Sequence, residues 1–184
     1  MKRQIIILSV LVILFIGKNL NAQVVNLLPV PQNIEWGKDK FQISGAKVVV
    51  SPELLSREQT SIAQFIDFVK QRTGLSLLTT STGVPDSRVI VLNSEQAGPA
   101  LPVLNEKPGN LSRESYRITV TAGKVIVNAK SDAALFYALQ TLQQLIVKEG
   151  TGSYIPQVNI EDFPSLAYRG VMMDFSHGGL LTEK

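Results

Sequence analysis

Two segments of this chain carry apolar residues at helical spacing, and short β-branched runs surround both of them. The first apolar stripe follows the i, i+3, i+4, i+7 pattern of one helix face and consists of Ile62, Phe65, Ile66 and Val69. The second begins after Ser131 and consists of Leu135, Leu139, Leu142, Leu145 and Ile146. An amphipathic helix is stable only when another element covers its apolar face. The chain must therefore fold around both stripes at once.

The runs between and around the helices predict the covering element. Alternating or β-branched residues indicate strands over 41–43, 47–50, 75–78, 88–93 and 154–160, the last interrupted by Pro156. Residues 116–121 and 125–128, joined by Ala122-Gly123-Lys124, have the pattern of a β-hairpin. The order of elements up to residue 160 predicts an α+β domain, in which two helices pack on a mixed or antiparallel sheet.

Capping and turn residues set the expected ends of these elements. Ser56, with Gln59 three residues later, predicts the start of the first helix, and Gly74 predicts its left-handed end. Ser131 predicts the N-cap of the second helix, and Gly150 and Gly152 its end. We expect turns or connections at 36–40 and 161–164, and the longest loop at 94–114.

Residues 1–22 have the pattern of a secretory signal peptide. Two basic residues precede an apolar run from Ile5 to Ile16, and a polar stretch then ends at Ala22. The run is shorter than the roughly 20 residues that span a bilayer. We expect cleavage near Ala22 and a secreted or periplasmic protein without a membrane partner; an uncleaved anchor is the alternative. Cleavage would remove the three basic residues Lys2, Arg3 and Lys18 and leave a mature net charge of zero, 15 basic against 15 acidic. A neutral mature chain does not favour a nucleic-acid partner.

The run Tyr168 to Phe175 is apolar and bounded by charges. Such a run is typical of a strand that is buried on both faces, as in a parallel barrel. A complete barrel needs roughly 250 residues, more than this chain of 184 can supply beside another domain. We therefore expect three parts: the signal peptide at 1–22, the α+β domain at 23–163, and an incomplete barrel start at 164–184.

Several kinds of active site are excluded by composition. The chain has no Cys and one His, which removes disulfides, thiol nucleophiles and a two-His metal site within one chain. We expect no metal and no cofactor. The charges of interest are Arg169 and Asp174 in the last apolar run, with His177 just after it. Arg169 and Asp174 either face solvent or pair with each other, or they lie at opposite ends of one barrel strand. In the last arrangement the planar guanidinium of Arg169 could bind sugar hydroxyls.

Three segments together resemble the β-N-acetylhexosaminidases of glycoside hydrolase family 20. The first, at 28–36, is similar to the Pro-x-Pro opening of that family's N-terminal domain. The second, at 134–145, is similar to the helix that closes that domain, and the third, at 162–176, is similar to the start of the catalytic barrel. The ordered set spans the mature chain and agrees with the α+β domain predicted from the residues.

The resemblance implies retaining hydrolysis in which the acetamido group of the substrate is the nucleophile. It also implies that Arg169 binds hydroxyls of a terminal N-acetylhexosamine and that Asp174 helps to shape the site. The family often continues with Ser-Arg-His where this chain has Ser176-His177-Gly178, which weakens the transfer of a role to His177. The Asp-Glu pair that does the chemistry is missing, because no Asp-Glu dipeptide occurs in the chain.

The main hypothesis is therefore the N-terminal part of a secreted hexosaminidase, inactive alone, acting on N-acetylhexosamine-containing glycans once the missing barrel is present as its intramolecular partner. One alternative is a non-catalytic accessory or carbohydrate-binding module that acts with a separate partner. Another is a different acetylglucosaminidase family that carries a similar N-terminal domain. The Met172-Met173-Asp174-Phe175-Ser176 run favours the first family over this last alternative.

Overall fold

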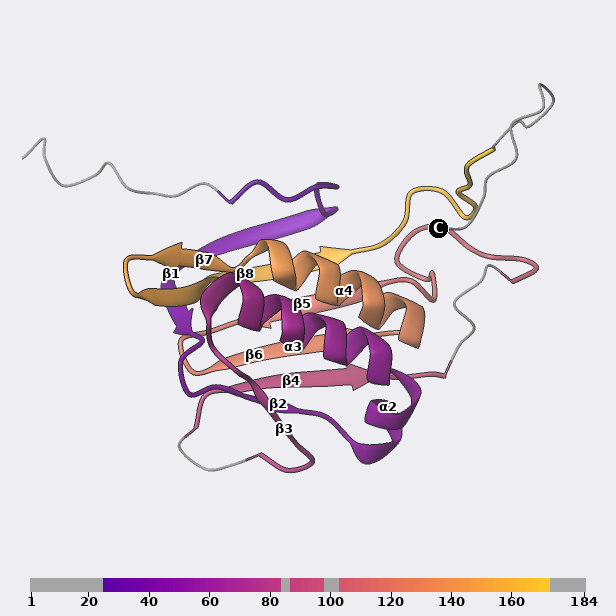
Figure 1. Ribbon diagram of the computed structural model, residues 1–184. Helices are drawn as coiled ribbons and strands as arrows, with labels where there is room; N and C mark the ends of the chain where they lie inside the picture. Colours follow the sequence, from indigo (N-terminus) through magenta and orange to yellow (C-terminus); the bar gives the residue numbers. More distant parts are fainter. Residues whose placement is uncertain (1–24, 84–86, 98–102, 173–184) are drawn as a thin grey trace, which may run out of the picture.

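The computed structural model describes residues 25–83, 87–97 and 103–172 (Figure 1). The predicted signal peptide at 1–22 and the residues Asp174 and His177 lie outside the described residues. In chain order the elements are β1 (Asn33–Gln42), β2 (Lys47–Val49), α2 (Pro52–Arg57), α3 (Gln59–Thr73), β3 (Leu78–Thr80), β4 (Val89–Ser94), β5 (Tyr116–Val120), β6 (Lys124–Ala129), α4 (Asp132–Gln144), β7 (Val147–Glu149) and β8 (Gly152–Asp162).

The strands form one mixed sheet in the order β1-β8-β5-β6-β4-β2-β3. Strand β2 pairs in parallel with β3 and β4, and β4 in parallel with β6. The pairs β5/β6, β5/β8 and β1/β8 are antiparallel. The short β7 pairs with the first residues of β8, where β5 does not reach. The α+β prediction, with a mixed sheet and a β5–β6 hairpin, is confirmed.

Helices α3 and α4 lie side by side on one face of the sheet, with the short α2 at one end of α3 (Figure 1). The alternation that predicted the strands is reflected in their burial: Tyr116, Ile118 and Val120 of β5 are buried, and Arg117 between them is exposed. The largest side chains with almost no exposed surface include Phe41, Phe65, Ile118, Leu135, Leu139 and Leu142. Both predicted stripes therefore pack into one core, and only Ile66 of the first is partly exposed.

Two of the predicted helix caps, Ser131 and Gly74, are confirmed, and the cap predicted at Ser56 is wrong. Ser131 caps α4 by accepting from the Ala134 amide, and Gly74 ends α3 in the left-handed conformation at φ 77°. Ser56 is not an N-cap, because it lies inside the short α2, which begins at Pro52 with Ser51 accepting from the Leu54 amide. The N-cap position of α3 is Glu58. Proline at the first helical position has the right fixed φ and lacks an N–H that would have no partner, so it favours the earlier start.

The turn predicted at 36–40 is instead an irregular part of β1. The register with β8 shifts between Trp36 and Lys40. The Gln157 side-chain oxygen accepts from the amides of Lys38 and Asp39, each at 3.0 Å. A Cβ at Gly37 would lie 2.2 Å from Gln157 Cδ, so only glycine allows this approach. A side chain from β8 thus replaces ladder bonds and keeps the strand continuous.

Strand ends near the C-terminal half also differ from the prediction. Helix α4 ends at Gln144, and β7 follows it before Gly150, so Gly150 and Gly152 lie at the β7–β8 connection instead. Pro156 does not interrupt β8, because it lies after the stretch that pairs with β7 and before the stretch that pairs with β5. The expected connection at 161–164 begins later, since β8 includes Asp162. The strand expected at 75–78 starts at Leu78 instead.

Residues 163–172 form neither helix nor strand. The buried strand predicted for 168–175 is therefore not formed in its described part, 168–172, where Val171 and Met172 are 90% and 91% exposed. A buried barrel strand needs a neighbour on each side for its backbone groups, and the described residues provide no ladder partner here. Within residues 25–83, 87–97 and 103–172, no helix is long and apolar enough to cross a membrane.

Candidate functional site

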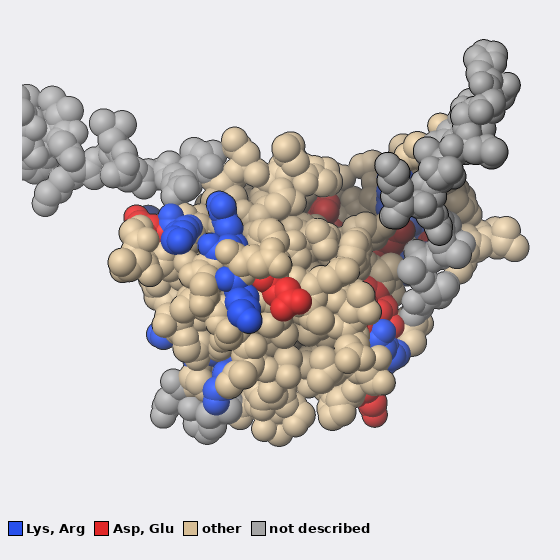
Figure 2. Space-filling model, viewed as in Figure 1, with Lys and Arg blue, Asp and Glu red and all other residues tan. Residues whose placement is uncertain are grey.

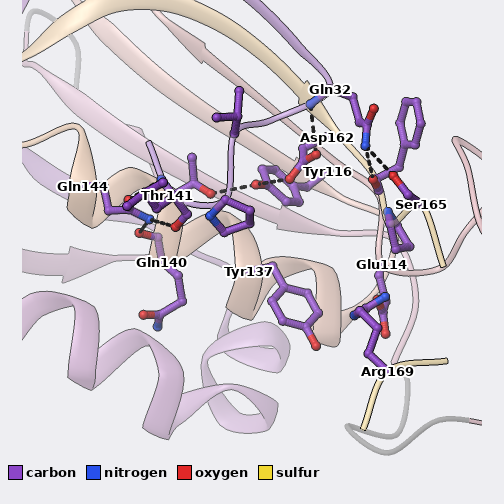
Figure 3. A pocket seen from close by; sticks show the side chains of 15 residues that line it. Gln32, Glu114, Tyr116, Tyr137, Gln140, Thr141, Gln144, Asp162, Ser165 and Arg169 are labelled. Carbon is purple, nitrogen blue, oxygen red and sulfur yellow. Dashed lines mark hydrogen bonds and ion pairs between the residues drawn. The ribbon is translucent and has the colours of Figure 1, made fainter. Parts of the chain in front are cut away.

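A groove of about 440 Å³ opens between three parts of the fold: α4, residues 28–32 and residues 163–169 (Figure 3). The 28–32 segment precedes β1, and the 163–169 segment follows β8, so the antiparallel pairing of these two strands brings them together. The groove thus forms where the chain enters and leaves the sheet.

The floor of the groove is a hydrogen-bonded network around the buried Tyr116. Its hydroxyl donates to Asp162 Oδ2 at 2.8 Å and lies 2.7 Å from the hydroxyl of Thr141. Since the single tyrosine proton goes to the carboxylate, the threonine hydroxyl is the donor in the second bond. Burial raises the pKa of Tyr116 strongly, and the Asp162 charge adds to that effect against the opposing bond from Thr141. This network joins β5, α4 and β8.

Two glutamines hold the 28–32 segment that precedes β1. The Gln144 amide donates to the Leu28 carbonyl at 3.0 Å and accepts from the Leu28 N–H at 2.9 Å. The Gln32 side chain donates to Ser165 Oγ at 2.9 Å and to the Phe163 carbonyl at 3.4 Å. The 28–32 segment is therefore tied both to α4 and to the residues that follow β8.

Arg169, the sugar-binding candidate from the sequence, lies at the rim of the groove and pairs with Glu114. Its Nη2 donates to Glu114 Oε2, and its Nη1 donates to the Leu166 carbonyl at 2.8 Å. The Glu114 side chain is 10% exposed and the Arg169 side chain 44%. The bond to Glu114 raises the pKa of Arg169, with burial opposing and the Tyr137 phenol contributing. Figure 3 shows this phenol pointing toward the guanidinium.

The structure brings Arg169 to a site but tests none of the predicted roles. Asp174 and His177 lie outside the described residues, so their relation to Arg169 is not described. Sequence reasoning did not single out Glu114, Gln32 or Asp162. A carboxylate in a polar loop and a glutamine in an extended segment carry no local signal of burial or pairing, because their partners are distant in sequence.

The groove offers groups for recognition rather than for proton transfer. Both carboxylates are already engaged, Glu114 with Arg169 and Asp162 with Tyr116. Within the described ranges, no group of three or more His, Cys, Asp or Glu side chains could hold a metal ion. Tyr137 on α4 lines the groove and is 38% exposed, so it adds aromatic surface.

Comparisons with known proteins agree on one family. Residues 24–163 match the family model described as glycosyl hydrolase family 20, domain 2. A β-hexosaminidase from Porphyromonas gingivalis is 28% identical over 168 residues, covering 86% of this chain and 20% of the relative. An N,N'-diacetylchitobiase from Vibrio harveyi is 27% identical, covering 80% of this chain and 15% of the relative.

Solved structures give the same result. The chitobiase of Flavobacterium johnsoniae superposes with a TM-score of 0.64 at 28% identity, covering 84% of this chain and 23% of that one. A β-N-acetylhexosaminidase from Streptomyces coelicolor gives a TM-score of 0.58 at 26% identity, covering 83% of this chain and 29% of that one. The chain thus spans 20% or less of the two curated relatives and under a third of the two solved chains.

Proposed function

Since this chain belongs to glycosyl hydrolase family 20 and carries its domain 2, we propose that it is the N-terminal part of a secreted β-N-acetylhexosaminidase. The whole enzyme would remove terminal N-acetylhexosamine residues from glycans. The single observation that carries the proposal is the match of nearly the whole described α+β domain to domain 2 of a hydrolase family, with the Tyr168-Arg169-Gly170 segment directly after it.

In the proposed enzyme the chemistry belongs to polypeptide beyond this chain. Retaining hydrolysis assisted by the substrate's acetamido group needs a carboxylic acid for the leaving oxygen and a carboxylate for the acetamido group. No Asp-Glu dipeptide occurs here. Positioned acid–base catalysis contributes roughly 10²–10⁴-fold, and charge stabilisation usually contributes more. We therefore expect the 184-residue chain to be inactive alone.

Arg169 is the proposed substrate-binding residue of this chain. A guanidinium has five N–H donors in a fixed plane, and the bonds to Glu114 and Leu166 use two of them. The other donors are suited to vicinal sugar hydroxyls, and the Glu114 bond restricts the orientation of the fork. Asp174 and His177 are proposed as parts of the same site's architecture, and residues 1–22 as its export signal.

A second candidate, a non-catalytic accessory or carbohydrate-binding module, is favoured by one observation. The groove is formed within the described domain, and Tyr137, a half-buried aromatic residue, lies on its wall beside polar side chains. Sugars bind to such surfaces by stacking and by hydrogen bonds to planar side chains. This module would act with a separately made catalytic partner.

Activity assays on two proteins distinguish the candidates. One is the 184-residue chain, and the other is the product of the reading frame continued past Lys184. The enzyme proposal predicts that only the longer product releases nitrophenol from 4-nitrophenyl N-acetyl-β-D-glucosaminide. In that product, Arg169→Ala should mainly raise KM, and unchanged kinetics would remove Arg169 from the sugar site. The module proposal predicts instead that the 184-residue chain binds chitobiose by calorimetry.

A further inference from the structure

Residues 163–169 have no regular secondary structure, yet two loops of the domain hold them. On one side, the Gln32 side chain donates to Ser165 and Phe163. On the other side, the Gly109 amide donates to the Pro164 carbonyl at 2.8 Å. A connection between domains is usually an exposed linker with few contacts. These bonds indicate that this segment is not such a linker.

The far end of the segment is bound by side chains. The Tyr168 hydroxyl donates to the Val103 carbonyl at 3.2 Å and accepts from the Glu106 amide at 3.1 Å. Arg169 pairs with the largely buried Glu114. Among the described residues that follow Arg169, Val171 and Met172 are almost fully exposed. The loop residues 103–114 therefore hold the segment as far as Arg169.

The receiving loop is itself fixed to the domain. Arg113 pairs with the Glu106 carboxylate, whose side chain is 5% exposed. The Ser115 hydroxyl donates to the carbonyls of Gly109 and Asn110, and the Ser131 hydroxyl donates to the Arg113 carbonyl. The longest connection in the chain is thus ordered where it meets the segment.

We propose that Glu114, Tyr168, Arg169 and Gln32 form a clasp that fixes the direction in which the chain leaves the N-terminal domain. The clasp directs the chain from the end of β8 past α4. Apart from the buried Asp132, α4 has no charged residue, and Figure 2 shows mainly uncharged surface over it. One consequence rests on the proposed function. In the hexosaminidase, the polypeptide that follows Arg169 would leave the N-terminal domain at a fixed position and not through a flexible linker.

Chymotrypsin cleavage of the full chain tests the clasp, because cleavage at a locally opened site follows the population of the open state. Leu166 and Tyr168 supply cleavage sites within the segment. Glu114→Gln keeps the shape of the side chain but removes its charge. We expect it to speed cleavage after Leu166 and Tyr168 about fivefold, as loss of a partly exposed ion pair predicts. Tyr168→Phe keeps a cleavage site, loses both hydroxyl bonds, and should act in the same direction.

A matched control removes an ion pair that lies outside the clasp. Arg117 pairs with Glu161 at 3.0 Å on the exposed face of β5 and β8. Glu161→Gln should change cleavage less than twofold. Glu114→Gln and Arg169→Gln should each speed cleavage, and their combination should add little more, since both remove one interaction.

The opposite results would overturn the clasp. They are wild-type cleavage rates in both Glu114→Gln and Tyr168→Phe, or faster cleavage only together with unfolding of the whole domain by circular dichroism. The assay needs no substrate. An inactive longer product combined with slow wild-type cleavage and fast Glu114→Gln cleavage would therefore reject the proposed function and keep the clasp.

Discussion

Tyr116→Phe removes one oxygen from the floor of the groove and leaves the buried Thr141 and the partly buried Asp162 without their shared partner. The Tyr116 hydroxyl donates to Asp162 at 2.8 Å and receives the Thr141 proton at 2.7 Å, with Tyr116 and Thr141 only 6% and 8% exposed. Loss of a buried hydrogen bond to a charged group costs about 1.5–3 kcal/mol. We expect the free energy of unfolding to fall by about 2 kcal/mol, which lowers Tm by roughly 4–8 °C in a domain of this size.

Urea unfolding of wild type, Tyr116→Phe, Thr141→Val and the double variant measures the coupling directly. Thr141→Val alone should destabilise the domain, because it removes the donor to Tyr116 and keeps the shape of the side chain. The double variant should be less destabilised than the sum of the singles, since it leaves no orphaned hydroxyl at Thr141. The claim that this network stabilises the contact of β5, α4 and β8 would be refuted by either of two results. One is a double variant whose loss of unfolding free energy equals the sum of the two single losses, and the other is a Tyr116→Phe variant as stable as wild type.

Other consequences of the structure can be measured separately. Leu139→Ala should lower the free energy of unfolding by about 2–5 kcal/mol in urea titrations, because Leu139 is 1% exposed in the core. Asp132→Ala should lower the free energy of unfolding by about 2 kcal/mol, because the side chain is 6% exposed, binds Arg57 through both carboxylate oxygens and accepts from Ser94. Arg117→Ala, which removes an exposed ion pair, is the control. A loss no larger than that of the control would contradict the prediction. Burial alone would raise the pKa of Glu106, but bonds from Arg113 and the Val103 amide hold it below the usual 4.5. Its contribution to stability is therefore present above pH 4.5 and lost as the pH falls through the lowered pKa. The hydrogen-exchange protection factors across 103–115, corrected for the intrinsic pH dependence of amide exchange, should therefore fall there in wild type and change less in Glu106→Gln.

The parts of the fold that the sequence predicted depend on neighbours in the chain. The Ser131 cap, the Gly74 end and the β5–β6 hairpin each need only a few consecutive residues, and all three are confirmed. The start of α2 at Pro52 also has a local signal, Ser51 as N-cap followed by proline at the first helical position. The capping-box pattern at Ser56 and Gln59 predicts a later start, and that prediction is wrong.

The parts that were missed depend on distant residues. The region around Gly37 stays in β1 because Gln157, about 120 positions away, supplies acceptors for two amides of β1. Glu114 lies in a polar loop, and its partner Arg169 is 55 positions later. The resemblance identified Arg169 as a residue of interest, but only the fold could show that a buried carboxylate from the first domain binds it.

The most direct test of the proposed function is the hydrolysis of 4-nitrophenyl N-acetyl-β-D-glucosaminide by the product of the reading frame continued past Lys184. The proposal predicts nitrophenol release by that product, none by the 184-residue chain, and loss of activity when an Asp-Glu pair in the added part is changed to Asn-Gln. A folded longer product without such a pair, or one that leaves the substrate intact while the 184-residue chain binds chitobiose, would contradict the enzyme and support the carbohydrate-binding module.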